Sequence, residues 1–244
     1  MDLNLKDKII FITGGTGDIG KAIIKVFIDE GAKVAFTYNS SDNKARDIIN
    51  EFGEKVKGFK VSVTDFNGLQ ETVRTVIDNW QGIDILINNA AKAEVLPFPL
   101  IEEEDWDDLM DTNLKGIFLT TKAVVRHFIV RKKGAIVNVG SIAGERVMEA
   151  PAHYAASKSA ISGFTFSLAK ELGRYNVRVN SVVPGLIDGG VSVKVPEKQQ
   201  QQYINYCSLS RLGTPEEVAN VIAFVASEKS AYMNGQRVFV DGGI

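Results

Sequence analysis

Seven short runs rich in isoleucine and valine alternate with longer amphipathic stretches along the chain. The runs are nearly continuous in apolar residues, which is typical of strands buried on both faces of a parallel sheet. They lie at residues 8–13, 33–38, 56–61, 83–87, 135–139, 178–182 and 237–240. The clearest helical stretches lie at residues 19–29, 43–52, 67–79, 102–131, 152–172 and 215–226. This alternation predicts an α/β fold, namely a Rossmann-like, doubly wound parallel sheet of about seven strands with helices on both faces.

Length and composition place the chain among ordinary globular proteins. Its 244 residues suit one domain, 1–244, and no linker or repeat divides them. The formal net charge of −2 gives no electrostatic reason to expect binding to nucleic acid or a membrane. The single cysteine, Cys207, excludes an intrachain disulfide and suits a reducing compartment. Without a signal peptide or an apolar run of about 18 residues, we expect a cytoplasmic protein, and we expect no metal site.

Residues 185–210 form the least regular segment of the sequence. Long irregular stretches within compact domains are often functional, and many act as lids over a binding site. The four glutamines at 199–202 are most simply interpreted as a solvated helix face. We therefore predict a substrate lid in this segment.

A glycine-rich turn follows the first predicted strand and opens the first predicted helix. Gly15, Gly17 and Gly20 match the pattern G-x-G-x-x-G, which is typical of dinucleotide binding in this strand-turn-helix setting. The helix amino terminus supplies N–H groups and partial positive charge for a pyrophosphate. Because like charges repel, we expect Asp18 to turn away from the phosphates or to cap the helix. The predicted contacts of the turn are Gly14, Gly15, Thr16, Gly17, Asp18 and Ile19.

The end of the second predicted strand indicates which dinucleotide binds. An acidic residue about 20 positions after the glycines usually binds the 2′-hydroxyl of the NAD ribose. Residues 37–41 read Thr-Tyr-Asn-Ser-Ser, without an acid, and Lys44 and Arg46 follow closely. Hydroxyl groups and local positive charge favour a 2′-phosphate, so we expect NADP rather than NAD, although Lys44 and Arg46 also fit a solvated helix face. The predicted contacts here are Tyr38, Asn39 and Ser40.

Tyr154 and Lys158 lie four residues apart in the predicted helix 152–172, so their side chains share one face. A phenol loses its proton near pH ~10, and a neighbouring ammonium group is expected to lower that pKa. The pair therefore predicts a general acid/base that protonates a carbonyl oxygen or deprotonates an alcohol. Ser141 is placed to hold the same oxygen. The spacing alone also occurs by chance, and it gains weight from the glycine turn that precedes it.

These elements together resemble the compact, single-domain form of the short-chain dehydrogenase/reductase family over nearly the whole chain. The resemblance implies an NAD(P)-dependent oxidoreductase acting on CH–OH groups. The elements that carry it are the glycine turn, Asp65, Asn-Asn-Ala-Ala at 88–91, Asn113, Ser141, Tyr154-x-x-x-Lys158, Pro184-Gly185 and Gly-Gln-Arg-Val-Phe-Val-Asp-Gly-Gly at 235–243.

The resemblance also implies a role for each of these residues. Tyr154 would exchange a proton with the substrate oxygen, and Lys158 would lower the tyrosine pKa and bind the nicotinamide ribose. Ser141 would orient the carbonyl group, and Asn113 would hold a water molecule in a proton relay from Lys158 towards solvent. Asp65 would face the adenine ring, although it also fits a helix cap. The remaining implied cofactor contacts are Asn89, Ala90, Ala91, Pro184, Gly185 and the backbone of Ile187.

The sequence departs from the usual family pattern in three places. Asp18 stands where the common motif Thr-Gly-x-x-x-Gly-x-Gly has its middle glycine. Ala91 ends a motif that is usually Asn-Asn-Ala-Gly, and Gly189 stands where a threonine usually touches the nicotinamide amide. These departures concern the grip on the cofactor and the shape of a loop, and none of them removes a catalytic group.

Within the family, the chain is most similar to the 3-oxoacyl-[acyl-carrier-protein] reductases. The similar segments are Thr-Tyr-Asn-Ser-Ser at 37–41 and Arg-Leu-Gly-Thr-Pro-Glu-Glu-Val at 211–218, but many sugar and alcohol dehydrogenases share the second. In those reductases, basic residues beside the cleft receive an acidic acyl carrier protein. A basic run here fits the same role, or equally a solvated helix end. It consists of Arg126, Arg131, Lys132, Lys133, Lys170 and Arg174.

We therefore expect an NADPH-dependent ketoreductase that converts a carbonyl group, most simply that of a 3-oxoacyl thioester, to a secondary alcohol. A secondary-alcohol or sugar dehydrogenase is the alternative enzyme, and a non-catalytic dinucleotide-binding sensor or scaffold is the alternative from another class. Members of the family usually pair their long helices, here 102–131 and 152–172. We accordingly expect a homotetramer or a homodimer.

Overall fold

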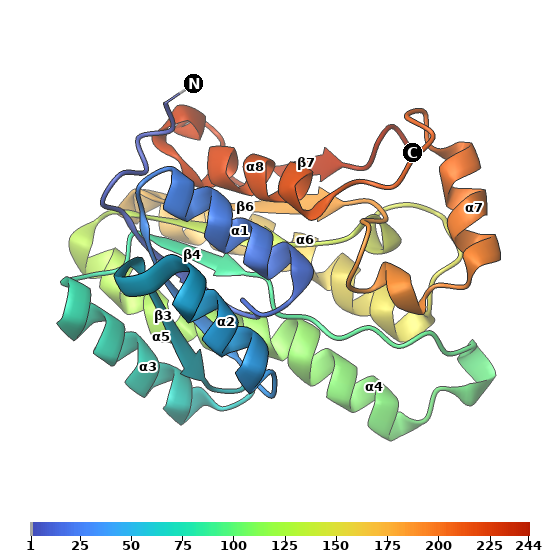
Figure 1. Cartoon of the computed structure of the whole chain (residues 1–244), viewed down its shortest axis with the longest axis horizontal. Helices are drawn as coiled ribbons and strands as arrows, with labels where there is room; N and C mark the ends of the chain where they lie inside the picture. Colours follow the sequence, from blue (N-terminus) through green and yellow to red (C-terminus); the bar gives the residue numbers. More distant parts are fainter. Residues whose placement is uncertain (1) are drawn as a thin grey trace.

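Seven parallel strands form one sheet in the order β3-β2-β1-β4-β5-β6-β7 (Figure 1). The computed structural model describes residues 2–244. The strand order reverses between β1 and β4, which is the arrangement of a doubly wound fold. All seven predicted strands are confirmed. Their bounds are β1 Ile9–Ile12, β2 Lys33–Tyr38, β3 Val56–Lys60, β4 Ile85–Asn88, β5 Gly134–Val139, β6 Val177–Pro184 and β7 Arg237–Val240.

Helices cover both faces of the sheet (Figure 1). Their bounds are α1 Asp18–Asp29, α2 Asp42–Phe52, α3 Phe66–Trp80, α4 Glu103–Met110, α5 Gly116–Arg131, α6 Ala152–Leu172, α7 Glu197–Tyr206 and α8 Pro215–Ala226. Within residues 2–244, no helix has both the length and the apolar character needed to cross a membrane.

The alternation of side chains along the strands divides the core into two layers. Ile10 and Ile12 of β1 pack with α1, α2 and α8, where Phe27 is fully buried. Phe11 points to the opposite face and packs with α3, α5 and α6, around the fully buried Phe128. Because successive strand residues point to opposite faces, a run that is apolar throughout must be covered on both sides. This explains why the strands read as continuous apolar runs.

The stretch predicted as one helix, 102–131, is interrupted by a π-helical turn at Asp111–Lys115. This turn separates α4 from α5 and shifts the helical register by one residue, which brings the side chain of Asn113 into the interior. The sequence pattern could not show the interruption, because apolar and polar residues continue at helical spacing on both sides of it. Gly116, the first residue of α5, follows this turn directly.

The segment predicted as a lid is more regular than expected. It contains a short 3-10 turn at Ser192–Lys194 and the helix α7. Three of the four glutamines make side-chain hydrogen bonds. The amide of Gln200 donates to the carbonyl oxygens of Ser192 and Val195, both at 2.9 Å, and that of Gln201 donates to Asn205 at 3.0 Å. The amide of Gln199 donates to Glu149 at 2.8 Å. The glutamine run therefore orders the segment rather than serving merely as a solvated face.

A chain of buried amide and hydroxyl groups links the sheet to the helices behind it. The amide of Asn88 in β4 donates to Thr121 at 3.0 Å and to Asn138 in β5 at 2.8 Å. Asn138 in turn donates to Thr165 in α6 at 2.9 Å. All four side chains are buried, so each hydrogen bond replaces water that the site excludes.

We predict that Asn138→Ala will lower the free energy of unfolding by about 2–4 kcal/mol, since it removes the partner of the buried Thr165 hydroxyl and one of the two partners of the Asn88 amide. Urea denaturation followed by circular dichroism measures the change. Asn79→Ala is the matched control, because the amide of Asn79 is exposed on α3 and bonds only to the Thr75 carbonyl. An Asn138→Ala variant as stable as this control would contradict the prediction.

Candidate functional site

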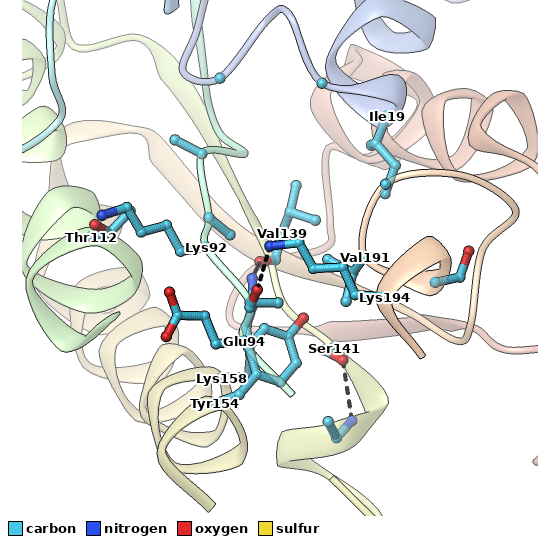
Figure 2. A pocket seen from close by; sticks show the side chains of 18 of the residues that line it. Ile19, Lys92, Glu94, Thr112, Val139, Ser141, Tyr154, Lys158, Val191 and Lys194 are labelled. Atoms are coloured by element: carbon cyan, nitrogen blue, oxygen red, sulfur yellow. Dashed lines mark hydrogen bonds between the residues drawn. The ribbon is translucent and has the colours of Figure 1, made fainter. Parts of the chain in front are cut away.

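A cleft of about 1170 Å³ runs along the carboxyl ends of the strands. It crosses the point between β1 and β4 where the strand order reverses, which is where open α/β sheets bind their ligands. Its walls are the glycine turn after β1, the end of β2, the loops after β4 and β5, and the segment after β6. Figure 2 shows Tyr154, Lys158 and Ser141 gathered in this cleft.

The glycine turn is fixed by the end of β4. The side-chain amide of Asn89 donates to the carbonyl oxygens of Thr13 and Gly14, both at 3.1 Å. The backbone N–H groups of Asn89 and Ala90 donate to the Thr13 hydroxyl, also at 3.1 Å. A side chain at Gly20 would collide with the Gly14 carbonyl, so only glycine allows α1 to start this close to the turn. The result is a cradle with a helix amino terminus pointing into the cleft, which fits a pyrophosphate.

Most of the predicted turn contacts lie in the cleft wall. They are Gly14, Thr16, Gly17, Asp18 and Ile19. Gly15 does not line the cleft, because it packs behind the turn against the ring of Phe36. Asp18 does not cap α1, since Gly17 holds the cap position. Its carboxylate instead accepts a hydrogen bond from the Gly190 N–H at 2.5 Å, across the cleft.

The end of β2 forms the part of the cleft predicted to bind the adenosine ribose. Tyr38, Asn39 and Ser40 line it as predicted, together with Ser41 and Lys44. The guanidinium of Arg46 bonds instead to the Asn43 side chain at 2.6 Å and lies outside the wall. The first carboxylate after β2, that of Asp42, is paired with Lys60 at 2.7 Å. Positive charge, rather than negative charge, therefore borders this end of the cleft.

The carboxylate of Asp65 has the second of its two expected functions. It accepts a hydrogen bond from the Gly68 N–H at 3.0 Å and caps α3. Its side chain is exposed and does not line the cleft among the described residues. The wall next to it is made by Val61, Ser62, Val63 and Thr64.

The helix α6 places Tyr154 and Lys158 on one face, as their spacing predicts. Lys158 is a buried residue, 4 % exposed, and its ammonium donates to the Val139 carbonyl at 3.1 Å and lies 5.8 Å from the centre of the Tyr154 ring. Ser141 follows β5, and its hydroxyl oxygen accepts from the Ala143 N–H at 3.2 Å. The hydroxyls of Tyr154 and Ser141 lie beside each other in the cleft (Figure 2). Two hydroxyl groups therefore point to one place in the cleft.

Burial controls the charge of this pair. Burial lowers the pKa of Lys158 from its ordinary 10.5 to about 8, because the interior disfavours the charged ammonium. Burial also raises the pKa of Tyr154 above its ordinary value, and the nearby Ser141 hydroxyl acts in the opposite direction. We expected Lys158 to lower the tyrosine pKa, but its ammonium is bonded to a backbone carbonyl rather than to the phenol oxygen, and burial dominates.

The amide of Asn113 is fully buried and ties three segments together. Its oxygen accepts from the Lys92 N–H at 2.7 Å, and its nitrogen donates to the Lys92 carbonyl at 3.0 Å. The same nitrogen donates to the Ser157 hydroxyl at 3.1 Å, and Ser157 donates to the Tyr154 carbonyl at 2.8 Å. Asn113 therefore fixes the loop after β4 to the helix that carries Tyr154, although it does not itself line the cleft.

The segment after β6 presents backbone groups to the cleft. Gly185, after the last β6 residue Pro184, donates its N–H to Val240 at 2.9 Å. The Leu186 carbonyl and the Asp188 N–H both bond to Gly213, at 3.1 and 2.8 Å. In an extended segment, alternate residues point their backbone groups to opposite sides. The N–H and carbonyl of Ile187 accordingly face away from Gly213, on the side of the cleft that this residue lines.

Several residues that line the substrate half of the cleft were not predicted. They are Lys92, Glu94, Thr112, Met148, Val191 and Lys194. They lie on the loops after β4 and β5, on the π-helical turn and in the segment after β6, where the sequence has no motif that fixes a direction. Within residues 2–244, no group of three His, Cys, Asp or Glu side chains is arranged to hold a metal ion.

The basic run lies far from the catalytic groups of its own chain. Arg131 ends α5 and bonds to the Ile83 carbonyl at 2.8 Å and to Asp84 at 3.0 Å, just before β4 begins. This is the amino-terminal edge of the sheet, about 24 Å along α5 from the helix start. Lys133 pairs with Glu228 at 3.5 Å. The expected position beside the cleft is therefore wrong within one chain, and two of the cations serve its own fold.

The fold and the cleft define a dinucleotide-binding protein of the doubly wound α/β class, with a tyrosine, a lysine and a serine gathered in its cleft. Residues 15–244 match the family described as enoyl-(acyl carrier protein) reductase. The chain is 39% identical to the 3-oxoacyl-[acyl-carrier-protein] reductase FabG of Thermotoga maritima over 99% of both chains. It is 33% identical to the enzyme of the same name from Escherichia coli, also over 99% of both. The chain belongs to the short-chain dehydrogenase/reductase family.

Solved structures agree with this assignment. A 3-oxoacyl-[acyl-carrier protein] reductase from Brucella melitensis superposes with a TM-score of 0.90 at 29% identity, covering 99% of this chain and 92% of its own. A short-chain dehydrogenase/reductase variant from Serratia marcescens gives 0.90 at 33% identity, over 98% of both chains. The resemblance found in the sequence motifs is confirmed. The chain is an NAD(P)-dependent oxidoreductase that acts on CH–OH groups.

The lowered pKa of Lys158 predicts how stability depends on pH. Between pH 8 and 10.5 the folded protein has released a proton that the unfolded chain still holds, so stability should rise with pH by at most about 3 kcal/mol. Urea denaturation at several pH values measures this rise. It should be absent from Lys158→Met and present in Lys229→Met, whose side chain is exposed. Equal slopes in both variants would contradict the assignment to Lys158.

Proposed function

We propose that this protein reduces the 3-oxo group of an acyl thioester to a secondary alcohol with NADPH. The observation that carries the proposal is the pair of hydroxyls, Tyr154 and Ser141, meeting on the wall of a dinucleotide cleft with the Lys158 ammonium behind them. Such a pair suits an oxygen that gains a proton while a hydride reaches the adjacent carbon.

The chain's own groups divide the chemistry between them. Ser141 donates a hydrogen bond that orients the substrate carbonyl, and Tyr154 gives its proton to the oxygen as negative charge develops there. Lys158 holds a positive charge 5.8 Å from the centre of the Tyr154 ring, and this charge would offset part of the burial that raises the pKa of the phenol, so that the phenolate can form in the reaction. Asn113 fixes the position of the loop after β4 relative to α6. We propose that a water molecule near Asn113 relays protons between Lys158 and solvent. A bound nicotinamide cofactor supplies the hydride.

The cradle described above fits a dinucleotide, and the β2 end favours NADP. Tyr38, Asn39 and Ser40 offer polar groups, Lys44 adds a positive charge, and the Asp42 carboxylate is already paired with Lys60. A 2′-phosphate gains from a cation here and meets no unpaired acid.

We predict that Lys44→Ala will lower kcat/KM for NADPH about tenfold, because one charge-assisted contact to the 2′-phosphate is lost. The same change should leave kcat/KM for NADH nearly unaltered. Arg46→Ala is the matched control, since that guanidinium bonds to Asn43 outside the cleft. Steady-state kinetics with both cofactors decides, and a parallel loss with NADH would contradict a role in phosphate binding.

Two reactions are suggested by the names of similar proteins. The matching family is described by reduction of an enoyl group, whereas the similar curated proteins from Thermotoga maritima and Escherichia coli are named for reduction of a 3-oxo group. A hydroxyl pair that converges on one point fits a carbonyl oxygen better than a carbon–carbon double bond, because it donates two hydrogen bonds to a developing oxyanion. We therefore favour the 3-oxo substrate.

We further propose that the acyl group is delivered on a carrier protein and that the enzyme works as a homodimer or homotetramer. The exposed cations at the ends of α5 and α6 suit an acidic partner, but they lie at the edge opposite their own cleft. Antiparallel pairing of α5 and α6 between two copies would place the cations of one copy nearer the cleft of the other. Exposed Phe118 and Phe166 on these helices support such pairing. Four cations of the basic run form no ion pair with a carboxylate within residues 2–244, namely Arg126, Lys132, Lys170 and Arg174.

The proposed function predicts a clear preference in one panel of substrates. Acetoacetyl thioesters of coenzyme A and of acyl carrier protein should be reduced with NADPH, the carrier form more efficiently, and crotonyl thioesters should not be. Absorbance at 340 nm measures turnover. Activity confined to sugars or simple secondary alcohols would favour the alternative dehydrogenase, and activity on crotonyl thioesters alone would overturn the choice of substrate.

Tyr154→Phe separates catalysis from binding. It should lower kcat by at least about a hundredfold, because the proton donor is lost, while the dissociation constant for NADPH measured by fluorescence changes little. Unchanged turnover would refute the mechanism. Cofactor binding without turnover of any substrate in the wild type would indicate a non-catalytic sensor.

We expect the protein in the cytoplasm, since its single cysteine, Cys207, suits a reducing compartment.

A further inference from the structure

Two of the three places where the sequence departs from the family pattern lie against each other. Asp18 replaces a glycine in the first turn of α1, and Gly189 replaces a threonine after β6. The Asp18 carboxylate accepts a hydrogen bond from the Gly190 N–H at 2.5 Å. A Cβ atom on Gly189 would lie 2.7 Å from Oδ2 of Asp18, closer than van der Waals contact allows. Residues far apart in the sequence are therefore fitted to each other.

We propose that Asp18 and Gly189 form a matched pair that anchors residues 189–194, here termed the strap, across the cleft. Asp18 is a positioning residue, because it touches the strap rather than the reacting atoms. The inference rests on the proposed function in one respect, since the strap matters through the cofactor and substrate that lie beneath it. Its structural basis is independent of which substrate is reduced.

The strap is tied at both ends and within itself. At its start, the N–H and hydroxyl of Ser192 both donate to the Gly189 carbonyl, at 3.2 and 2.9 Å. At its end, the Lys194 ammonium donates to the Ala93 carbonyl at 3.0 Å, on the loop after β4. The amide of Gln200 supports it from α7 by bonding to the Ser192 carbonyl. The strap therefore spans from α1 to the β4 loop, and Asp18 provides its anchor on α1.

The position of this anchor couples the two halves of the cleft. Asp18 is in the first turn of α1, whose amino terminus forms the pyrophosphate cradle and stabilises a carboxylate. Val191 and Lys194 of the strap line the substrate half, as Figure 2 shows. Whatever holds the Asp18 carboxylate in place therefore also sets the positions of side chains around the substrate.

Neither family residue can be restored alone without a cost. Gly189 has a φ of +91°, which a threonine rarely adopts, and its Cβ would collide with the Asp18 carboxylate. Glycine at position 18 would instead leave the Gly190 N–H without its acceptor. Removing the carboxylate relieves the collision but not the φ strain, so a threonine at 189 is better tolerated when Asp18 is absent. The effects of substitutions at the two positions on kcat/KM should therefore be non-additive.

Limited proteolysis tests the anchor without any assay of activity. Trypsin cleaves after Lys194 and Lys198, and the rate reports how often the segment opens. Asp18→Gly should raise this rate at least about fivefold, with global stability checked by thermal melting. Asp29→Asn is the matched control, since it removes one negative charge from the far end of α1 and should stay within about twofold of wild type. Equal rates in the two variants would overturn the proposal.

A double-mutant cycle tests the matching. Gly189→Thr should lower kcat/KM for NADPH at least about tenfold, and adding Asp18→Gly should recover at least about fivefold of that loss. Adding Asp29→Asn to Gly189→Thr should recover nothing. Additive losses in the Asp18 cycle would refute the pairing. If the 3-oxoacyl thioester is not reduced at all, the proposed function fails, and the same cycle is measured in the NADPH dissociation constant instead.

Discussion

All seven strands run in one direction, so their carboxyl ends meet at a single edge of the sheet. Helices bury both faces, and the edge opens where the strand order reverses between β1 and β4. The chain leaves β1, β4, β5 and β6 at this edge, and each exit supplies one wall of the cleft. Parallel strands therefore bring four parts of the site to the same edge of the sheet. These are the glycine turn, the loop held by Asn113, the Ser141 hydroxyl and the strap.

This constraint explains why much of the fold and part of the site could be predicted. A strand buried on two faces must be apolar throughout, and that pattern is visible in the sequence without knowledge of the strand order. Tyr154 and Lys158 share a helix face because of local geometry, and the glycine turn is likewise local. The cap that Asp65 gives to α3 is local as well, whereas the long-range contacts of Asn113 carry no such local signal. Asn113 reaches the Lys92 backbone only because a π-helical turn shifts its register.

Electrostatics was harder to predict than position. An ammonium four residues from a phenol is expected to lower its pKa, yet the ammonium of Lys158 bonds to the Val139 carbonyl and burial raises the pKa of Tyr154. Whether a neighbouring charge or desolvation dominates depends on the backbone groups nearby, which the spacing does not show. The position of the basic run was mispredicted for a related reason. The sequence shows that the end of a helix is basic, but the sheet determines which of its edges that helix end reaches.

The two departures at Asp18 and Gly189 show how transfer of residue roles can mislead when positions are taken one at a time. Considered separately, a carboxylate near a phosphate site and a lost threonine both suggest a weaker grip on the cofactor. Together they form one contact, in which the carboxylate binds the Gly190 N–H and glycine makes room for it. The Gly190 N–H and the amino terminus of α1 both stabilise the negative charge of this carboxylate, whether or not a phosphate is bound. An acid at this position is therefore compatible with a dinucleotide cleft because its hydrogen bond is directed at the strap.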